Sequence, residues 1–331
     1  MHNYQLWSRF AAIIIVGFAD TFIVHCALSI VHSPLHTPMK TQLLIVGAGA
    51  AGLSAACAAW DGGCRDILLV DKNDIPGGVL PQCTHAGFGL ATYGRELTGP
   101  EYARRILQKL HQTGVNLRLN TTVTAISPDR TALLFTNGAA ESVRFDRLIL
   151  ATGCRELNIG SLLIPGTRPE GIFTAGQAQE LLNLHGEDIG RDILILGSGD
   201  LGLIMARRFA EAGKHVIAVV EKNAHCGGMA RNYRRCIEAC HIPLLCSAEV
   251  TEIFGEPRLT GVTVRQNGAD SFVPCDTLIT AVGMLPERTL VRSLGSPDWL
   301  RCCGNCHRIH DLIDSAVREA TNIGKDFCHD R

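Results

Sequence analysis

The sequence predicts an α/β fold with two doubly wound, three-layer units, the second inserted into the first. From residue 42 onward, short apolar segments alternate with amphipathic ones, which is typical of parallel strands connected by helices. One strand–helix–strand pattern occurs twice, about 150 residues apart, which indicates an internal repeat. A chain of 331 residues is long enough for two domains of ordinary size.

The first unit opens with an apolar segment at residues 43–46, an alanine-rich segment at 50–60 and a second apolar segment at 67–70. We expect these to form a strand, a helix and a strand. Between residues 115 and 147, segments rich in Thr and Val alternate with turn sequences, which predicts a small antiparallel meander. An apolar segment at 148–153 follows the meander.

The second unit repeats this order. Segments 193–196, 201–212 and 216–220 again have the pattern of a strand, a helix and a strand. A second meander is expected at 248–273, and it is followed by an apolar segment at 278–283. The repeat therefore covers whole domains and not only their openings.

Charge and cysteine usage exclude several classes of protein. Lys and Arg total 31 and Asp and Glu total 32, so no net field attracts nucleic acid or an anionic bilayer. The fourteen cysteines are scattered through apolar segments, where Cys packs as a small hydrophobe, so we expect a reduced, cytoplasmic protein. Paired zinc-ligand spacings are absent, and His307 and His310 have no accompanying ligand set, so no metal site is predicted.

Residues 1–38 precede the first unit, and residues 10–31 are apolar over a length that would span a bilayer. Asp20 and His25 lie inside this segment, where charged groups are costly. We expect an apolar extension that is dispensable or that precedes the true start at Met39. The alternative is a membrane anchor through residues 10–31, with the protein then attached to a membrane.

Gly47, Gly49 and Gly52 have GxGxxG spacing at the junction of a predicted strand and helix. The first glycine permits a tight turn, the second lets a pyrophosphate approach the backbone, and the third lets the helix pack on the strand. The helix N-terminus then presents free N–H groups to the phosphates. Asp71 ends the second strand, where a carboxylate accepts hydrogen bonds from the adenosine ribose. These residues predict a Rossmann-like dinucleotide-binding domain.

Gly197, Gly199 and Gly202 repeat the glycine motif, and Glu221 ends the second strand of this unit. A carboxylate at this position bonds the free 2′-hydroxyl of NAD(H) and repels the 2′-phosphate of NADP(H). We therefore expect NAD(H) rather than NADP(H), with the neighbouring cation Lys222 weakening the preference. The alternative for Glu221 is a solvated charge at the end of a strand.

Further motifs follow the two units, at residues 151–153 and 282–287. With the glycine motifs, they resemble the pyridine nucleotide-disulfide oxidoreductase superfamily from Met39 to the C-terminus. More narrowly, residues 77–90 and 96–102 are similar to a bacterial subgroup. Its members are often paired with an anaerobic glycerol-3-phosphate dehydrogenase-like flavoprotein and a small CxxC protein.

The resemblance implies an FAD-binding domain at residues 39–156 and 285–331, and an NAD(H)-binding domain at 157–284. It also implies that the last helix, from about Asp311, points its N-terminus at the flavin ring. The residues implied for FAD are Gly47, Gly49, Gly52, Asp71, Gly77, Gly78, Thr152, Gly153, Gly304, Asn305 and Asp311. Those implied for NAD(H) are Gly197, Gly199, Gly202, Glu221 and Gly283.

The candidate catalytic residues are Cys83, His85 and His310. Cys83 stands alone after the glycine loop, with His85 close by, so a dithiol reductase is disfavoured. Either Cys83 is a thiolate stabilised by His85, or this loop simply packs on the flavin ring. Cys303 and Cys306 form a CxxC that is an alternative dithiol, and His310 is a candidate for polarising the flavin edge.

Together these features predict an FAD-dependent oxidoreductase that moves hydride or electrons between a nicotinamide nucleotide and flavin. The resemblance implies a partner that is a flavoprotein dehydrogenase, a small iron-sulfur or CxxC protein, or both. Segment 287–303 is shorter than in relatives, which puts FAD retention in question. Two alternatives stay open: a non-catalytic FAD-bearing subunit of a dehydrogenase complex, and a flavin dehydrogenase that acts directly on a small amine or hydroxy acid.

Overall fold

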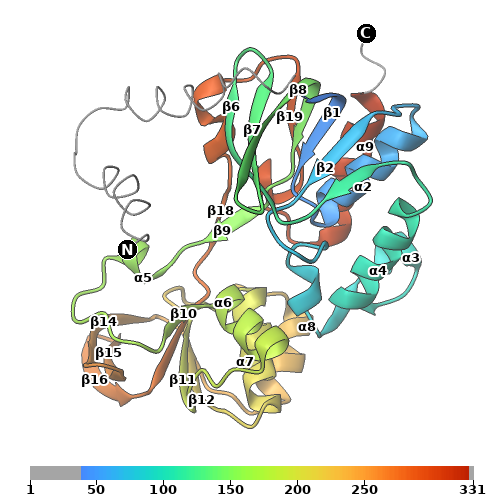
Figure 1. Ribbon diagram of the computed structural model, residues 1–331. Helices are drawn as coiled ribbons and strands as arrows, with labels where there is room; N and C mark the ends of the chain where they lie inside the picture. The colour runs from blue at the N-terminus through green and yellow to red at the C-terminus, as the bar shows by residue number, and fades with distance from the viewer. Residues whose placement is uncertain (1–38, 328–331) are drawn as a thin grey trace, which may run out of the picture.

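The computed structural model describes residues 39–327. The apolar segment 10–31, considered above as an anchor, lies outside the described residues. Among those residues, none of the helices combines the length and apolar character needed to cross a membrane. Figure 1 shows two lobes, each built around its own sheet and joined by two strands that run side by side.

Seven strands build the sheet of the first lobe: β1 (Met39–Val46), β2 (Ile67–Val70), β5 (Asn116–Arg118), β6 (Thr121–Ser127), β7 (Thr131–Thr136), β8 (Ala139–Leu150) and β19 (Leu300–Cys302). Their order is β5-β2-β1-β8-β7-β6, and β19 also pairs with β8. Although segment 287–303 is short, it therefore still supplies a strand to this sheet.

Strand β8 pairs with one neighbour antiparallel and with another parallel. Residues 139–144 pair antiparallel with β7, and residues 143–150 pair parallel with β1. The last strand of the meander and the apolar segment that follows it are therefore one continuous strand of 12 residues. This strand carries the chain directly to the end of the sheet where the glycine turn lies.

Residues of β1 alternate between the two faces of the sheet. Leu43 and Ile45 face a layer of helices, whereas Leu44 and Val46 face the meander of β6, β7 and β8. The helical layer consists of α2 (Ala50–Asp61), α4 (Gly99–Leu110) and α9 (Ile313–Asp326). Both faces of the parallel strands are thus buried, as the uniformly apolar sequence of β2 requires.

The second lobe repeats this architecture. Its parallel sheet has the order β10-β17-β11-β12-β13, with β10 (Ile172–Thr174), β11 (Asp192–Leu196), β12 (His215–Val220), β13 (Leu244–Leu245) and β17 (Thr277–Thr280). Helices α6 (Ala175–Glu180) and α7 (Asp200–Glu211) pack on one face, and the meander β14 (Ala248–Gly255), β15 (Leu259–Gln266), β16 (Ala269–Pro274) packs on the other. The predicted repeat is confirmed: the helices and strands around the two glycine turns lie within one residue of the expected ends, except that β1 begins at Met39 instead of residue 43.

The two lobes are joined by β9 (Cys154–Glu156) and β18 (Met284–Pro286), which pair antiparallel. The chain leaves the first lobe through β9 and returns to it through β18 (Figure 1). The second lobe is therefore an insertion between two parts of the first, as the fold prediction required.

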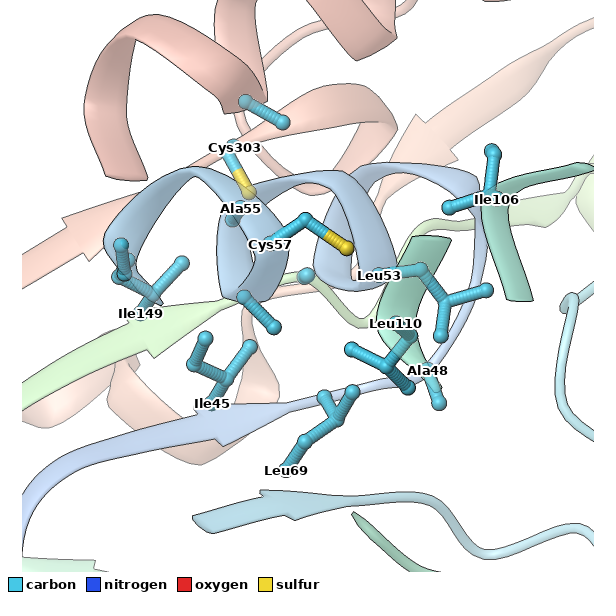
Figure 2. Packing of buried hydrophobic residues seen from close by; sticks show 14 of the residues in the cluster. Ile45, Ala48, Leu53, Ala55, Cys57, Leu69, Ile106, Leu110, Ile149 and Cys303 are labelled. Carbon is cyan, nitrogen blue, oxygen red and sulfur yellow. The ribbon is translucent and has the colours of Figure 1, made fainter. Parts of the chain in front are cut away.

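Small side chains let α2 lie close to both the sheet and α9. Figure 2 shows Leu53 and Cys57 of α2 above Ile45 and Leu69 of the sheet, within one buried cluster. On the other side of α2, a Cβ atom placed on Gly324 of α9 would lie 2.4 Å from the backbone oxygen of Ala55. Helix α2 is thus packed on two sides, by side chains of the sheet on one and by α9 on the other, where Gly324 admits the α2 backbone.

We expect Gly324→Leu to destabilise the protein by about 1–3 kcal/mol, because its side chain would push α9 away from α2. Urea unfolding followed by circular dichroism measures this change in the free energy of unfolding. Lys325→Leu is the matched control, because Lys325 lies one residue further along α9 and is exposed. Equal stability of the two variants would contradict the close packing of these helices.

Candidate functional site

The first glycine turn connects β1 to α2. Gly47 adopts a φ of +105°, and a Cβ atom there would lie 2.4 Å from the backbone oxygen of Ala151. A Cβ on Gly52 would lie 1.8 Å from the oxygen of Gly47, so the helix approaches the strand only without a side chain. At Gly49, by contrast, a Cβ would meet only the Cα of Gly78, at the ordinary distance of 3.7 Å.

Asp71 follows β2 and lies buried beside this turn. Its Oδ2 accepts a hydrogen bond from the backbone N–H of Ala48 at 2.6 Å, and its Oδ1 accepts one from Asn73 at 2.9 Å. Asp71 is the predicted partner of the adenosine ribose, and the structure places its carboxylate at the glycine turn.

The second glycine turn, between β11 and α7, has the same form. Gly197 adopts a φ of +98°, and a Cβ on Gly202 would lie 2.2 Å from the oxygen of Gly197. A Cβ on Gly199 would have no neighbour within 4 Å. In both turns the first and third glycines are required by the fold, but the second is not.

Glu221 lies buried beside the second turn and accepts four hydrogen bonds from two residues. The backbone N–H and hydroxyl of Ser198 donate to Oε2 at 3.0 and 2.7 Å, and the backbone and side-chain N–H groups of Asn223 donate to Oε1 at 2.9 and 2.7 Å. Burial alone would raise the pKa of Glu221, but these hydrogen bonds outweigh it and hold the pKa below its usual range. The carboxylate is therefore ionised at neutral pH.

A longer repeat surrounds both acids and was missed in the sequence analysis. Residues 71–78 and 221–228 share the pattern acid-Lys-Asn-x-x-x-Gly-Gly. In each lobe the Gly-Gly pair returns to the glycine turn, since Gly77 N–H donates to the Ala48 oxygen and Gly227 N–H donates to the Ser198 hydroxyl, both at 2.8 Å. Alignment of the two units on their acids would have revealed Ser198, Asn223 and the second Gly-Gly pair.

The strand ends next to the first turn bring three predicted segments together. Thr152 and Gly153 follow β8, and the Thr152 hydroxyl donates to the Glu287 oxygen at 2.6 Å. Cys303 N–H donates to the Leu150 oxygen at 3.0 Å, which positions the short helical turn at residues 304–306. Gly304 adopts a φ of +64°, and a Cβ there would lie 2.6 Å from the Cβ of Ala51 in the first turn of α2.

Both ends of the Asn305 side chain already have partners. Its oxygen accepts from the backbone N–H of His310 at 3.0 Å, and its nitrogen lies 3.7 Å from the Sγ of Cys154. Asp311 precedes Leu312, the N-cap of α9, so the helix begins two residues after the predicted start. At the second turn, Gly283 adopts a φ of +135° just before β18.

His310 is held by a carboxylate that the sequence analysis did not identify. Its Nε2 lies 3.0 Å from Oε2 of Glu319 on α9, and the Nδ1 of His307 lies 2.9 Å from Oε1. No group of three His, Cys, Asp or Glu residues with metal-binding geometry occurs within residues 39–327. In this structure the ring nitrogens of both histidines contact the carboxylate of Glu319.

Cys83 lies in a buried environment that favours the neutral thiol. Its Sγ lies 3.2 Å from the Val79 oxygen and 3.5 Å from Oε1 of Gln179, and burial raises its pKa to about 12. The ring centroids of His85 and Phe88 lie 5.0 Å apart. Burial, together with the nearby charge of Arg207, lowers the pKa of His85. These contacts and this burial oppose the thiolate form of Cys83, and packing of the loop on a flavin ring stays a prediction.

The predicted CxxC pair consists of two buried cysteines that are both thiols. Burial raises the pKa of Cys303. The Cys306 thiol instead interacts with Cys302, whose hydrogen bond lowers the pKa of Cys306 although burial opposes this effect. The sulfur neighbour of Cys306 is thus outside the CxxC motif.

The loop after the first Gly-Gly pair contacts the second lobe. The side-chain nitrogen of Gln82 donates to the Gly176 oxygen at 3.2 Å and to Oε1 of Gln179 at 3.3 Å. Asn183 donates to the Gln82 oxygen at 2.8 Å. These polar contacts fix the loop that carries Cys83 against helix α6.

Residues 41–297 match the family model of the pyridine nucleotide-disulphide oxidoreductases. An opine oxidase subunit of Rhizobium meliloti is 24% identical over 284 residues, which are 77% of this chain and 52% of the relative. The HcnB subunit of hydrogen cyanide synthase from Pseudomonas aeruginosa is 28% identical over 288 residues, which are 78% of this chain and 60% of the relative. The chain spans about half the length of these curated relatives.

Thioredoxin reductase of T. acidophilum has a similar structure, with a TM-score of 0.73 and 20% identity over 88% of this chain and 98% of its own. The NAD-dependent persulfide reductase of A. fulgidus has a TM-score of 0.67 and 20% identity over 88% of this chain and 60% of its own. These similarities confirm the predicted fold class. Since the family model covers more than half of the sequence, the chain belongs to the pyridine nucleotide-disulphide oxidoreductase family, whose members use FAD and a nicotinamide nucleotide.

Proposed function

We propose that this chain is an FAD-dependent oxidoreductase in which NADH reduces flavin and the electrons pass on to a partner redox protein. The open space at Gly49 and Gly199 carries the proposal. The backbone does not require glycine there, because φ is −74° and −62°, and no neighbouring atom obstructs a Cβ. A ligand phosphate that approaches the backbone explains the missing side chain at both positions.

FAD is assigned to the first lobe and the nicotinamide nucleotide to the second. Supporting this assignment, the turn at 304–306 adds backbone beside the first turn of α2. The residues proposed to hold FAD are Gly47, Gly49, Gly52, Asp71, Gly77, Gly78, Thr152, Gly153, Gly304, Asn305 and Asp311. Those proposed for the nicotinamide nucleotide are Gly197, Gly199, Gly202, Glu221 and Gly283.

Bound FAD supplies the two-electron acceptor for the hydride of NADH. The chain's own residues bind and orient the reactants. The N-termini of α2 and α7 would offer backbone N–H groups to the two pyrophosphates, and Asp71 and Glu221 would hold the adenosine riboses. Such a transfer depends on orientation and electrostatics and requires no acid–base pair, so no role is proposed for Cys83 or His85.

A redox partner is part of the proposal. Several relatives are named as components of larger enzymes, namely opine oxidase, hydrogen cyanide synthase and sarcosine oxidase. We propose a flavoprotein dehydrogenase, or a small iron-sulfur or CxxC protein, as in the glycerol-3-phosphate dehydrogenase-like subgroup. Cys83, Cys303 and Cys306 are thiols, which supports a reducing, cytoplasmic setting.

Anaerobic titration with NADH tests the proposed reaction. We expect the visible absorbance of bound flavin to bleach in proportion to added NADH, because hydride transfer reduces the ring. The names of these relatives favour a second candidate, an FAD-bearing component of a complex without its own reaction, for which flavin would bind but stay oxidised. Bleaching by a small amine or hydroxy acid without NADH would instead indicate direct dehydrogenation.

Alanine at the second glycine of each turn tests the assignment of the sites. We expect Gly199→Ala to weaken NADH binding by about tenfold or more without loss of FAD, because the methyl group occupies the path of the pyrophosphate. Gly49→Ala should weaken FAD binding and leave NADH binding intact. Isothermal titration calorimetry measures both affinities, and each variant controls for the other. Loss of both nucleotides in either variant would contradict two separate sites.

Replacement of Glu221 tests the choice of nicotinamide nucleotide. We expect Glu221→Gln to reduce the preference for NADH over NADPH by about tenfold, because the negative charge that repels a 2′-phosphate is removed. The ratio of kcat/KM values for flavin reduction by NADH and NADPH measures this preference. Glu211→Gln, on the exposed surface of α7, should leave the ratio unchanged. An unchanged ratio in Glu221→Gln would argue against a ribose-binding role.

A further inference from the structure

Glu319 accepts hydrogen bonds from one short segment of chain at four points. Gly304 N–H donates to Oε2 at 2.9 Å, and Nε2 of His310 lies 3.0 Å from the same oxygen. Nδ1 of His307 and Nε of Arg308 lie 2.9 and 3.4 Å from Oε1. One carboxylate on α9 thereby holds the whole turn from residue 304 to residue 310.

This carboxylate is ionised although it is largely buried. The side chains of Glu319 and His310 are 15% and 4% exposed. Burial alone would raise the pKa of Glu319, but hydrogen bonds from His307, His310 and Gly304 outweigh it and lower the pKa. A buried charge is stable only when it is paired and hydrogen-bonded, so the turn and the carboxylate depend on each other.

The segment that Glu319 holds is also the one that lies against the first dinucleotide turn. Gly304 packs on Ala51, at the start of α2. The backbone N–H of His310 donates to Oδ1 of Asn305, so the position of His310 fixes the Asn305 side chain as well. Displacement of Gly304 and His310 would therefore alter the wall of this site.

We propose that Glu319 is a positioning residue of the flavin site, which fixes the 304–310 segment against α2 and sets the local charge beside the flavin. The inference rests on the proposed function, because it requires FAD in the first lobe. It adds a residue with no position in the glycine motifs, on the final helix. Glu319 acts through Gly304 and His310 and is not expected to touch the cofactor.

Removal of this charge has a consequence that loss of packing alone would not have. Without the carboxylate, the positive charge of Arg308 would be left without its partner beside the turn proposed to line the flavin site. Positive charge near the ring stabilises reduced flavin, so the midpoint potential would become more positive. General destabilisation would weaken FAD binding without shifting the midpoint potential in a set direction. Weaker FAD binding together with a more positive midpoint potential therefore indicates the positioning and charge role of Glu319.

The test uses the full chain reconstituted with FAD. We expect Glu319→Gln to weaken FAD binding by about tenfold, measured by quenching of flavin fluorescence. The amide keeps only one of the two acceptor oxygens, so the four donors from residues 304–310 can no longer all be paired. The midpoint potential, measured against a reference dye, should become more positive. Asp326→Asn is the matched control: it makes the same carboxylate-to-amide change on α9 at an exposed position, so FAD affinity should stay within about twofold of wild type.

Unchanged FAD affinity and potential in Glu319→Gln would overturn the inference while leaving the proposed function intact, provided that wild type binds FAD and is bleached by NADH. Wild type that takes up no FAD would overturn both. If Glu319→Gln fails to fold, His310→Gln and His310→Ala replace it. His310→Gln keeps an N–H donor for Glu319 and should retain FAD, whereas His310→Ala should lose affinity; equal affinities would overturn the inference.

Discussion

Each lobe depends on a backbone contact between a helix and the turn that precedes it. In both turns the Cα of the third glycine lies so close to the carbonyl oxygen of the first that no Cβ fits between them, as at Gly52 with Gly47 and Gly202 with Gly197. This contact brings the N-terminus of the helix to the end of the central strand. The acids and the Gly-Gly pairs are in turn hydrogen-bonded to these two turns.

The two turns are built alike but are not equivalent. In the first, Asp71 bonds the backbone of Ala48, which has no polar side chain. In the second, Ser198 adds a hydroxyl that bonds both Glu221 and Gly227, so the acid and the Gly-Gly loop are linked through one side chain. A ribose that binds Glu221 must therefore share an acceptor whose hydrogen-bonding capacity is already used, whereas Asp71 has capacity to spare.

Local patterns allowed much of the fold to be predicted. The strands and helices around each turn are buried, and their apolar residues recur with the short spacing that identifies a strand or a helix. The β2 strand at 67–70 and helix α7 illustrate this. The site was less predictable where partners are distant in sequence. Glu319 meets Gly304 only after α9 folds back on α2, and the thiol environment of Cys83 depends on Gln179 from the other lobe. Neither contact leaves a periodic signal, whereas the repeat at 221–228 does.

The paired strands β9 and β18 limit how one lobe could move relative to the other. The two strands that connect the lobes pair with each other, with Arg155 opposite Leu285, and so form a single two-stranded ribbon. Two separate linkers would allow sliding and splaying, but a ribbon of this kind yields mainly by twisting about its long axis. Any reorientation of the inserted lobe would therefore be mainly a twist of this ribbon, and it would have to break the Gln82 contacts with Gly176 and Gln179.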